Sequence, residues 1–161
     1  MRINRIILSV ALLFVFIIIF TGCITTPAPQ STPEEKQMVQ SQIAYQKNLT
    51  KILDSLLTHR KNEHWDEINN DGLKIIEISN IQYNYVKNLN ATPKYEKLKS
   101  LFLSEIESNK QAGEIYDNMS TICPSYDVNL CKLSLSSALD SLGTANNYLD
   151  LSLEEMKKLG W

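Results

Sequence analysis

Residues 128–156 carry apolar or small side chains at alternating steps of three and four. This spacing puts every member on one face of an α-helix, and it is the pattern with which helices pack at a small left-handed crossing angle. The C-terminal part of the chain must therefore form a long helix that packs along one face. The members of this face are Val128, Cys131, Leu135, Ala138, Leu142, Ala145, Leu149, Ser152 and Met156.

Three earlier stretches show the same periodicity between recognisable helix starts and stops. Thr32, Pro33 and Glu35 have the form of a capping box with proline in the first turn. Asn62 is expected to cap the second helix, and Thr92-Pro93 to end it and start the third. The predicted helices cover 33–58, 62–89, 92–123 and, from 125 or 127, the stretch to 158.

Four long helices joined by short turns predict an all-α fold, an up-down-up-down four-helix bundle over 33–161. The triplet Asn70-Asp71-Gly72 is a turn signal inside the second helix, so we expect a soft spot or kink there. Gly113 and the alanines of the fourth helix predict a close approach between the third and fourth helices.

The first 23 residues have the layout of a secretory signal peptide. Arg2 and Arg5 precede an apolar run over 6–20 that only Ser9 interrupts. The run is shorter than the roughly 20 residues that a spanning helix needs, although extension through Thr25 would allow an uncleaved anchor. In both cases the arginines keep the N-terminus cytoplasmic and direct the remainder outward.

The end of this segment predicts lipid attachment at Cys23. Phe20-Thr21-Gly22-Cys23 resembles the lipobox of secreted lipoproteins, although Phe20 replaces the usual leucine. Residues 24–32 follow as a Pro- and Thr-rich linker without periodicity. We therefore expect the cell membrane as the location, with the domain anchored on its outer, extracytoplasmic face.

The charge balance weighs against nucleic acid as a partner. The chain has 16 Lys and Arg against 18 Asp and Glu, a net charge of −2 that becomes −4 once Arg2 and Arg5 are removed. Such a mildly acidic domain does not attract polyanions. The membrane is the expected partner, through the N-terminal anchor or lipid, together with an unidentified protein partner.

Cys123 and Cys131 are expected to form a disulfide, because they flank a turn at Pro124 and an exported domain meets an oxidising environment. Such a bond would add about 2–3 kcal/mol in the chain-entropy model. Asn90 lies in a predicted turn and is the most credible candidate for N-glycosylation among three Asn-x-Ser/Thr motifs.

No residue pattern predicts catalysis, a cofactor or a metal. The residues three positions before His59 and His64 are Leu56 and Lys61, so the Glu-x-x-His pairs of di-metal bundles are missing. A surface metal site from His59, Glu63, His64 and Glu67 is conceivable but less favoured than solvated turn residues. The carboxylates, among them Glu105 and Glu107, are expected on solvated faces.

The chain resembles small, largely uncharacterised membrane lipoproteins of archaea and bacteria. The resemblance rests on the lipobox and linker and on the following loose motifs: Trp65, Thr92-Pro93-Lys94-Tyr95, Leu101-Phe102-Leu103, Ala112-Gly113, Gly143 and Tyr148. It implies a helical bundle at the cell surface and transfers no catalytic residue.

Two functions follow as hypotheses. The first is a non-enzymatic binding or assembly role of a membrane-anchored bundle. The alternative is an extracytoplasmic small-ligand-binding or sensory module that acts through a partner, with a cavity lined by tyrosines. The tyrosines in question are Tyr45, Tyr83, Tyr95, Tyr116 and Tyr148.

Overall fold

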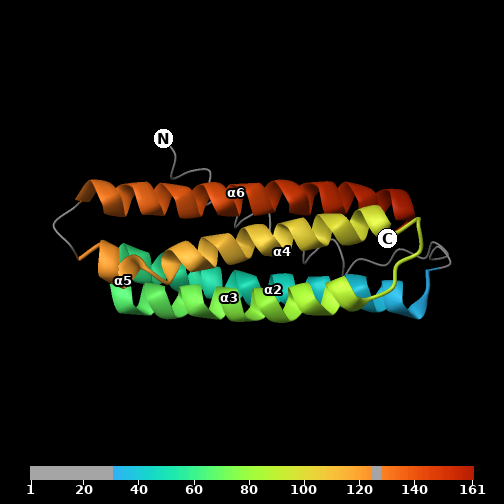
Figure 1. The fold of residues 1–161 in the computed structure, drawn as a ribbon, viewed down its shortest axis with the longest axis horizontal. Coiled ribbons are helices and arrows are strands. Elements are labelled where there is room, and N and C mark those ends of the chain that lie inside the picture. The colour runs from blue at the N-terminus through green and yellow to red at the C-terminus, as the bar shows by residue number, and fades with distance from the viewer. Residues whose placement is uncertain (1–30, 125–127) are drawn as a thin grey trace.

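The computed structural model describes residues 31–124 and 128–161, and this part of the chain is all-α. Figure 1 shows the long helices side by side along the long axis of the molecule. The two described segments contain no strand. The helices are α2 (Pro33–Lys61), α3 (Trp65–Asn88), α4 (Glu96–Tyr116), the four-residue α5 (Met119–Ile122) and α6 (Val128–Leu159).

The N-terminal predictions concern residues that the structure does not describe. The signal peptide over 1–23, with its Cys23, and residues 24–30 of the linker lie outside the described residues. Within 31–124 and 128–161, no helix combines the length and the apolar character that crossing a membrane requires.

Each long helix packs against the next one along the chain. The close pairs are α2 with α3, α3 with α4, and α4 with α6. Among the described residues, no comparable packing joins α2 to α6. The helices α3 and α4 therefore form a central pair, with α2 packed on α3 and α6 packed on α4.

The capping box at the start of α2 is present, as the sequence predicts. Oγ1 of Thr32 accepts a hydrogen bond from the backbone N–H of Glu35 at 3.2 Å. Oε2 of Glu35 accepts one from the N–H of Thr32 at 2.7 Å. Two N–H groups that the first turn leaves without helical partners are thereby satisfied.

Thr92 does not cap the next helix, in contrast to the prediction. Its N–H and its hydroxyl both donate to Oε1 of Glu35, at 3.0 and 2.5 Å, and α4 begins at Glu96. Burial acts to raise the pKa of Glu35, but the hydrogen bonds from Thr92 and Thr32 outweigh it and lower this pKa. One carboxylate thus joins the start of α2 to the α3–α4 connection.

The second helix also begins later than predicted. Asn62 ends α2, since its N–H donates to the carbonyls of Arg60 and His59, and α3 begins at Trp65. Glu63 has a φ of 55°, the left-handed conformation that is uncommon outside glycine. The connection between the helices is therefore a tight turn that uses Asn62.

Two glycines let α3 and α4 approach backbone to backbone. A Cβ on Gly72 would lie 2.5 Å from the amide nitrogen of Asp117 and 2.8 Å from the carbonyl oxygen of Gly113. A Cβ on Gly113 would lie 3.0 Å from the oxygen of Gly72. Gly113 therefore serves the contact with α3 rather than the predicted contact with the fourth helix, and α3 stays helical through Gly72.

The predicted third helix over 92–123 is divided at this contact. α4 ends at Tyr116, and α5 begins at Met119. The N–H of Asp117 donates to the carbonyl of Gly113 at 2.8 Å, whereas that of Asn118 turns to Ile115 at 3.2 Å. The helix therefore breaks where the backbone of α3 lies against it.

The apolar core follows the central pair. The buried side chains of α6 are Ala138, Ala145, Ser152 and Met156, which the spacing predicts, and Leu159, which lies outside the predicted face, whereas Val128 is 60% exposed. The largest fully buried apolar side chains are Met38, Leu56, Ile68, Ile75, Tyr95, Leu98, Phe102, Ile106, Tyr116 and Met119.

Two glycine substitutions test the contact between α3 and α4. We expect Gly72→Ala to destabilise the protein by about 1–3 kcal/mol, because its Cβ meets backbone that cannot move aside. Gly143→Ala is the matched control: its Cβ meets no atom within 4 Å, so the better helix former should stabilise α6 by about 0.5–1 kcal/mol. Urea unfolding followed by circular dichroism measures both. Equal effects of the two substitutions would contradict the proposed contact.

Candidate functional site: a groove between α2 and α6

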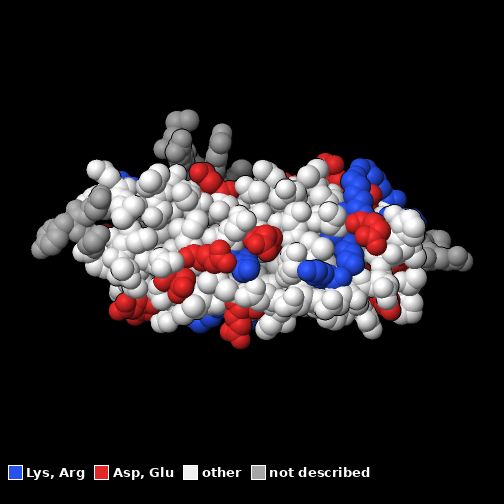
Figure 2. All heavy atoms as spheres, in the orientation of Figure 1, with Lys and Arg blue, Asp and Glu red and all other residues white. Residues whose placement is uncertain are grey.

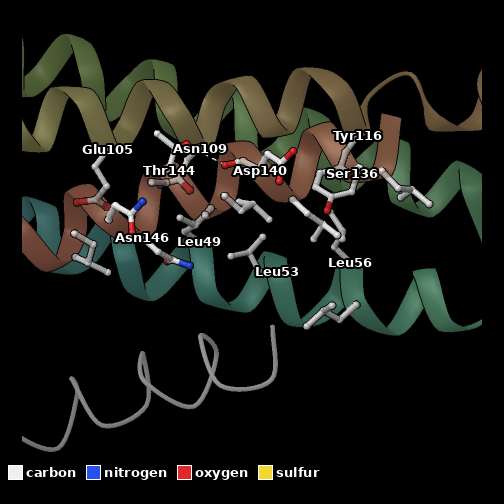
Figure 3. Close-up of a pocket in the computed structure, with 18 of the residues that line it drawn as sticks. Leu49, Leu53, Leu56, Glu105, Asn109, Tyr116, Ser136, Asp140, Thr144 and Asn146 are labelled. Carbon is white, nitrogen blue, oxygen red and sulfur yellow. Dashed lines mark hydrogen bonds between the residues drawn. The ribbon is translucent and has the colours of Figure 1, made fainter. Parts of the chain in front are cut away.

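A cavity of about 1010 Å³ lies between α2 and α6, where these two helices lack close packing. Figure 3 shows side chains of α2, α4 and α6 around the same space. We call this cavity the α2/α6 groove. Its volume is in the range of small-molecule sites. Eight leucines line it: Leu49, Leu53, Leu56 and Leu57 of α2, and Leu135, Leu139, Leu142 and Leu149 of α6.

The contribution of α4 to the groove is polar. Glu105, Asn109 and Tyr116 line it from this helix, at 1%, 3% and 1% exposure. Burial raises the pKa of Tyr116 to about 12, so its hydroxyl is neutral at physiological pH. The groove therefore combines leucine walls with a small set of buried polar groups.

Glu105 accepts hydrogen bonds on both carboxyl oxygens. Nε2 of Gln42 donates to its Oε2 at 3.2 Å, and Nε2 of Gln46 makes a short contact with its Oε1. Both glutamines are themselves buried in α2. A carboxyl on α4 is thus held by two amides from the helix across the bundle.

The orientation of the Gln42 amide is fixed by α3. Nε2 of Gln82 donates to Oε1 of Gln42 at 3.1 Å, so the Gln42 nitrogen is the atom that faces Glu105. The same Gln82 nitrogen donates to Oγ of Ser41 at 3.1 Å. Three helices therefore contribute to one chain of hydrogen bonds that ends at the Glu105 carboxyl.

Burial raises the pKa of Glu105 to about 8, against the opposing effect of the Gln42 hydrogen bond. None of the ion pairs of the described residues includes Glu105. The amide donors suit a carboxylate, but low solvation without a cation favours the protonated acid. The site therefore holds a buried carboxyl that has no cation partner among the described residues.

Sequence reasoning missed Glu105, because it assigned this residue to a solvated face. The finding that it is buried corrects that prediction, and the spacing carried the information. Glu105 lies three residues after Phe102 and four before Asn109, which in turn leads to Ala112 and Tyr116 on the same buried face. A polar residue in step with an apolar stripe is the signal of a buried polar site.

The tyrosines mainly pack rather than line the groove. Tyr45 and Tyr95 belong to the core, and Tyr116 also faces the groove. The hydroxyl of Tyr45 hydrogen-bonds Oγ of Ser79 at 3.0 Å, and burial raises its pKa. The groove is therefore lined by leucines more than by tyrosines.

The two histidines lie at the α2–α3 turn but do not gather carboxylates for a metal. Nδ1 of His59 lies 2.9 Å from Oδ2 of Asp71, and Lys74 binds the other oxygen of Asp71 at 2.8 Å. Burial acts to raise the pKa of Asp71, but bonds with Lys74 and His59 lower it overall. Within the described residues, no three His, Cys, Asp or Glu side chains group as metal ligands.

The other predicted site residues lie away from the groove. Cys123 and Cys131 have their sulfur atoms 2.02 Å apart, which is bonding distance, and this pair ties the end of α5 to the first turn of α6. Asn90 is exposed in the α3–α4 connection, where its N–H donates to Oε2 of Glu34 at 3.1 Å. Its glycosylation stays a prediction.

Charged side chains of both signs share the face seen in Figure 2, and the basic ones gather towards the end where α6 finishes. At that end Glu155 lies 2.7 Å from Nζ of Lys97 and 3.6 Å from Nζ of Lys158. The basic charge there is thus partly compensated.

Comparisons with known proteins add no relative: no family model, no curated protein and no solved structure matches the chain.

The pKa of Glu105 predicts a particular dependence of stability on pH. The folded pKa is about 8 and the ordinary value is 4.5, so between these values the unfolded chain loses a proton that the folded chain keeps. The contribution to stability is complete below pH 4.5 and falls by up to about 1.4 kcal/mol per pH unit until pH 8.

Urea unfolding from pH 5 to pH 8 measures this slope. We expect Glu105→Gln to remove the Glu105 contribution, whereas Glu107→Gln on the same helix should keep it, since Glu107 does not line the groove. The side-chain amide of Gln46 makes no second hydrogen bond among the described residues, so it can rotate to suit the new side chain. If the unfolding free energy had the same dependence on pH in the wild type, Glu105→Gln and Glu107→Gln, the pKa of Glu105 would not be raised.

Proposed function

We propose that this chain is a membrane-anchored, extracytoplasmic helical-bundle protein with a non-enzymatic binding role, and that the α2/α6 groove is its binding site. The observation that supports binding is the groove itself, with leucine walls, a buried polar floor and a volume of about 1010 Å³. Sites for small ligands likewise combine apolar walls with placed polar groups. The geometry therefore favours the small-ligand alternative over assembly with a protein partner.

In this proposal the four long helices form an up-down-up-down bundle behind an N-terminal anchor. Cys23 carries lipid, or the N-terminal helix is retained, and the linker over 24–32 holds the bundle outside the cell membrane. The support is the lipobox-like sequence together with the pairing distance of Cys123 and Cys131, which suits an oxidising compartment. The likeness to small membrane lipoproteins is part of the same proposal.

A groove-filling variant tests the binding role. Gly143 lines the groove, and a Cβ on it meets nothing within 4 Å, so Gly143→Phe places a ring in open space there. We expect the full chain in lipid nanodiscs to enhance the fluorescence of N-phenyl-1-naphthylamine above the level of empty nanodiscs, and Gly143→Phe to lose most of this additional enhancement. Gly143→Ala is the matched control and should retain it. Equal fluorescence from the two variants would rule out the groove as the site.

Intact mass spectrometry of the protein extracted from its native membrane tests the anchor. We expect a chain that begins at Cys23 and carries more than one acyl group, because a single chain binds membranes only marginally. Protease added outside intact cells should digest the bundle. A chain that retains Met1 would instead support the uncleaved anchor, and protection from external protease would contradict the outer location.

A further inference from the structure

We propose that the α2/α6 groove binds a cationic amphiphile, with the ammonium group at the Glu105 carboxyl and the apolar chain along the leucine walls. This inference rests on the proposed function and names its ligand class. It follows from a buried carboxyl without a cation partner in a groove with leucine walls.

The Glu105 carboxyl is surrounded by hydrogen-bond donors. Two amide N–H groups point at the carboxyl oxygens of Glu105. Gln82 donates to the amide oxygen of Gln42, so the nitrogen of that amide faces Glu105. Donors on both oxygens suit the ionised form, which a bound cation stabilises, whereas burial without a cation raises the pKa to about 8 and keeps the acid protonated below that pH. Each carboxylate oxygen has a second lone pair, so the site can accept a further donor.

The Glu105 carboxyl lacks a cation partner among the described residues. A buried carboxylate is stable when a cation pairs with it, and no described Lys, Arg or His forms an ion pair with Glu105. A ligand ammonium supplies this charge and up to three N–H donors. An anionic head group would add a second negative charge, and a neutral one would leave the carboxylate uncompensated.

The remaining space of the groove has a shape that suits an apolar chain. The lining of α2 extends from Gln46 to Arg60, which is about 20 Å at 1.5 Å per residue. Leucines of α2 and α6 occupy this length on both sides, so an unbranched apolar chain can lie along it. The ligand that fits both parts is an alkylammonium rather than a compact polar cation.

Several charged and titratable groups surround Glu105 and bear on how ligand binding depends on pH. Besides Glu105, the groove is lined by Arg60 of α2, Tyr116 of α4, and Lys132, Asp140 and Asp150 of α6, and Tyr45 of α2 feels the Glu105 charge. Ser79 and Gln82 are the polar neighbours from α3 in this network. Glu105 has a raised pKa and changes charge near neutrality, so binding of an ammonium at pH 6–7 should release about one proton.

Isothermal titration calorimetry of octylamine into the full chain in zwitterionic nanodiscs tests the inference. The heat measured with Gly143→Phe in the same discs is subtracted, because it reports the partitioning of octylamine into lipid. We expect octylamine to bind more tightly than 1-octanol, and octanoate not to bind. Affinity should rise up to about tenfold per pH unit between pH 5.5 and 7.5. Titrations in buffers of different ionisation enthalpy count the released proton.

The Glu105→Gln variant should lose roughly 10- to 100-fold in octylamine affinity, whereas Glu107→Gln should bind like the wild type. Circular dichroism confirms that both variants fold. Octylamine and 1-octanol binding equally, with no effect of Glu105→Gln, would overturn the ammonium site while the groove keeps its binding role. If neither octylamine nor 1-octanol bound above the Gly143→Phe background, both proposals would be overturned. If octanoate bound more tightly than octylamine, the preference of the groove for a cationic head group would be overturned.

Discussion

The backbone contact between α3 and α4 at Gly72 and Gly113 is the constraint on which the other helix positions depend. Two helices whose backbones meet at these glycines form a fixed central pair on which the outer helices pack. α2 packs against α3, and α6 packs against α4. The groove between α2 and α6 is the space that this order of packing leaves, and it lies along the polar residues of α4.

The polar residues inside the bundle act as one connected unit. Ser41, Gln42 and Gln46 of α2, Gln82 of α3 and Glu105 of α4 are joined by hydrogen bonds, so the register of these helices is set by directional contacts as well as by apolar burial. Such a network is stable only when every member is satisfied. The carboxyl at its end is the member that has no cation partner among the described residues.

Local signals in the sequence were sufficient for the helical fold, and long-range contacts were not. The capping box of Thr32 and Glu35, the buried face of α6 and the pairing of Cys123 with Cys131 depend on residues close in sequence, and the patterns predicted them. Thr92 was misassigned because its partner, Glu35, is distant in the chain. Glu105 was misassigned for a different reason, because its spacing from Phe102 and Asn109 already places it on the buried face of α4. Only its glutamine partners on another helix lie beyond what helical periodicity indicates.

The bonds of Glu35 have a mechanical consequence. In the proposed tethered form, a pull from the membrane would reach the described part of the chain beside Thr32. The Glu35 carboxylate there binds both the first turn of α2 and Thr92 of the α3–α4 connection. Load is therefore shared between two segments that are remote in sequence, and fraying of α2 at this end must break the three hydrogen bonds of the Glu35 carboxylate together.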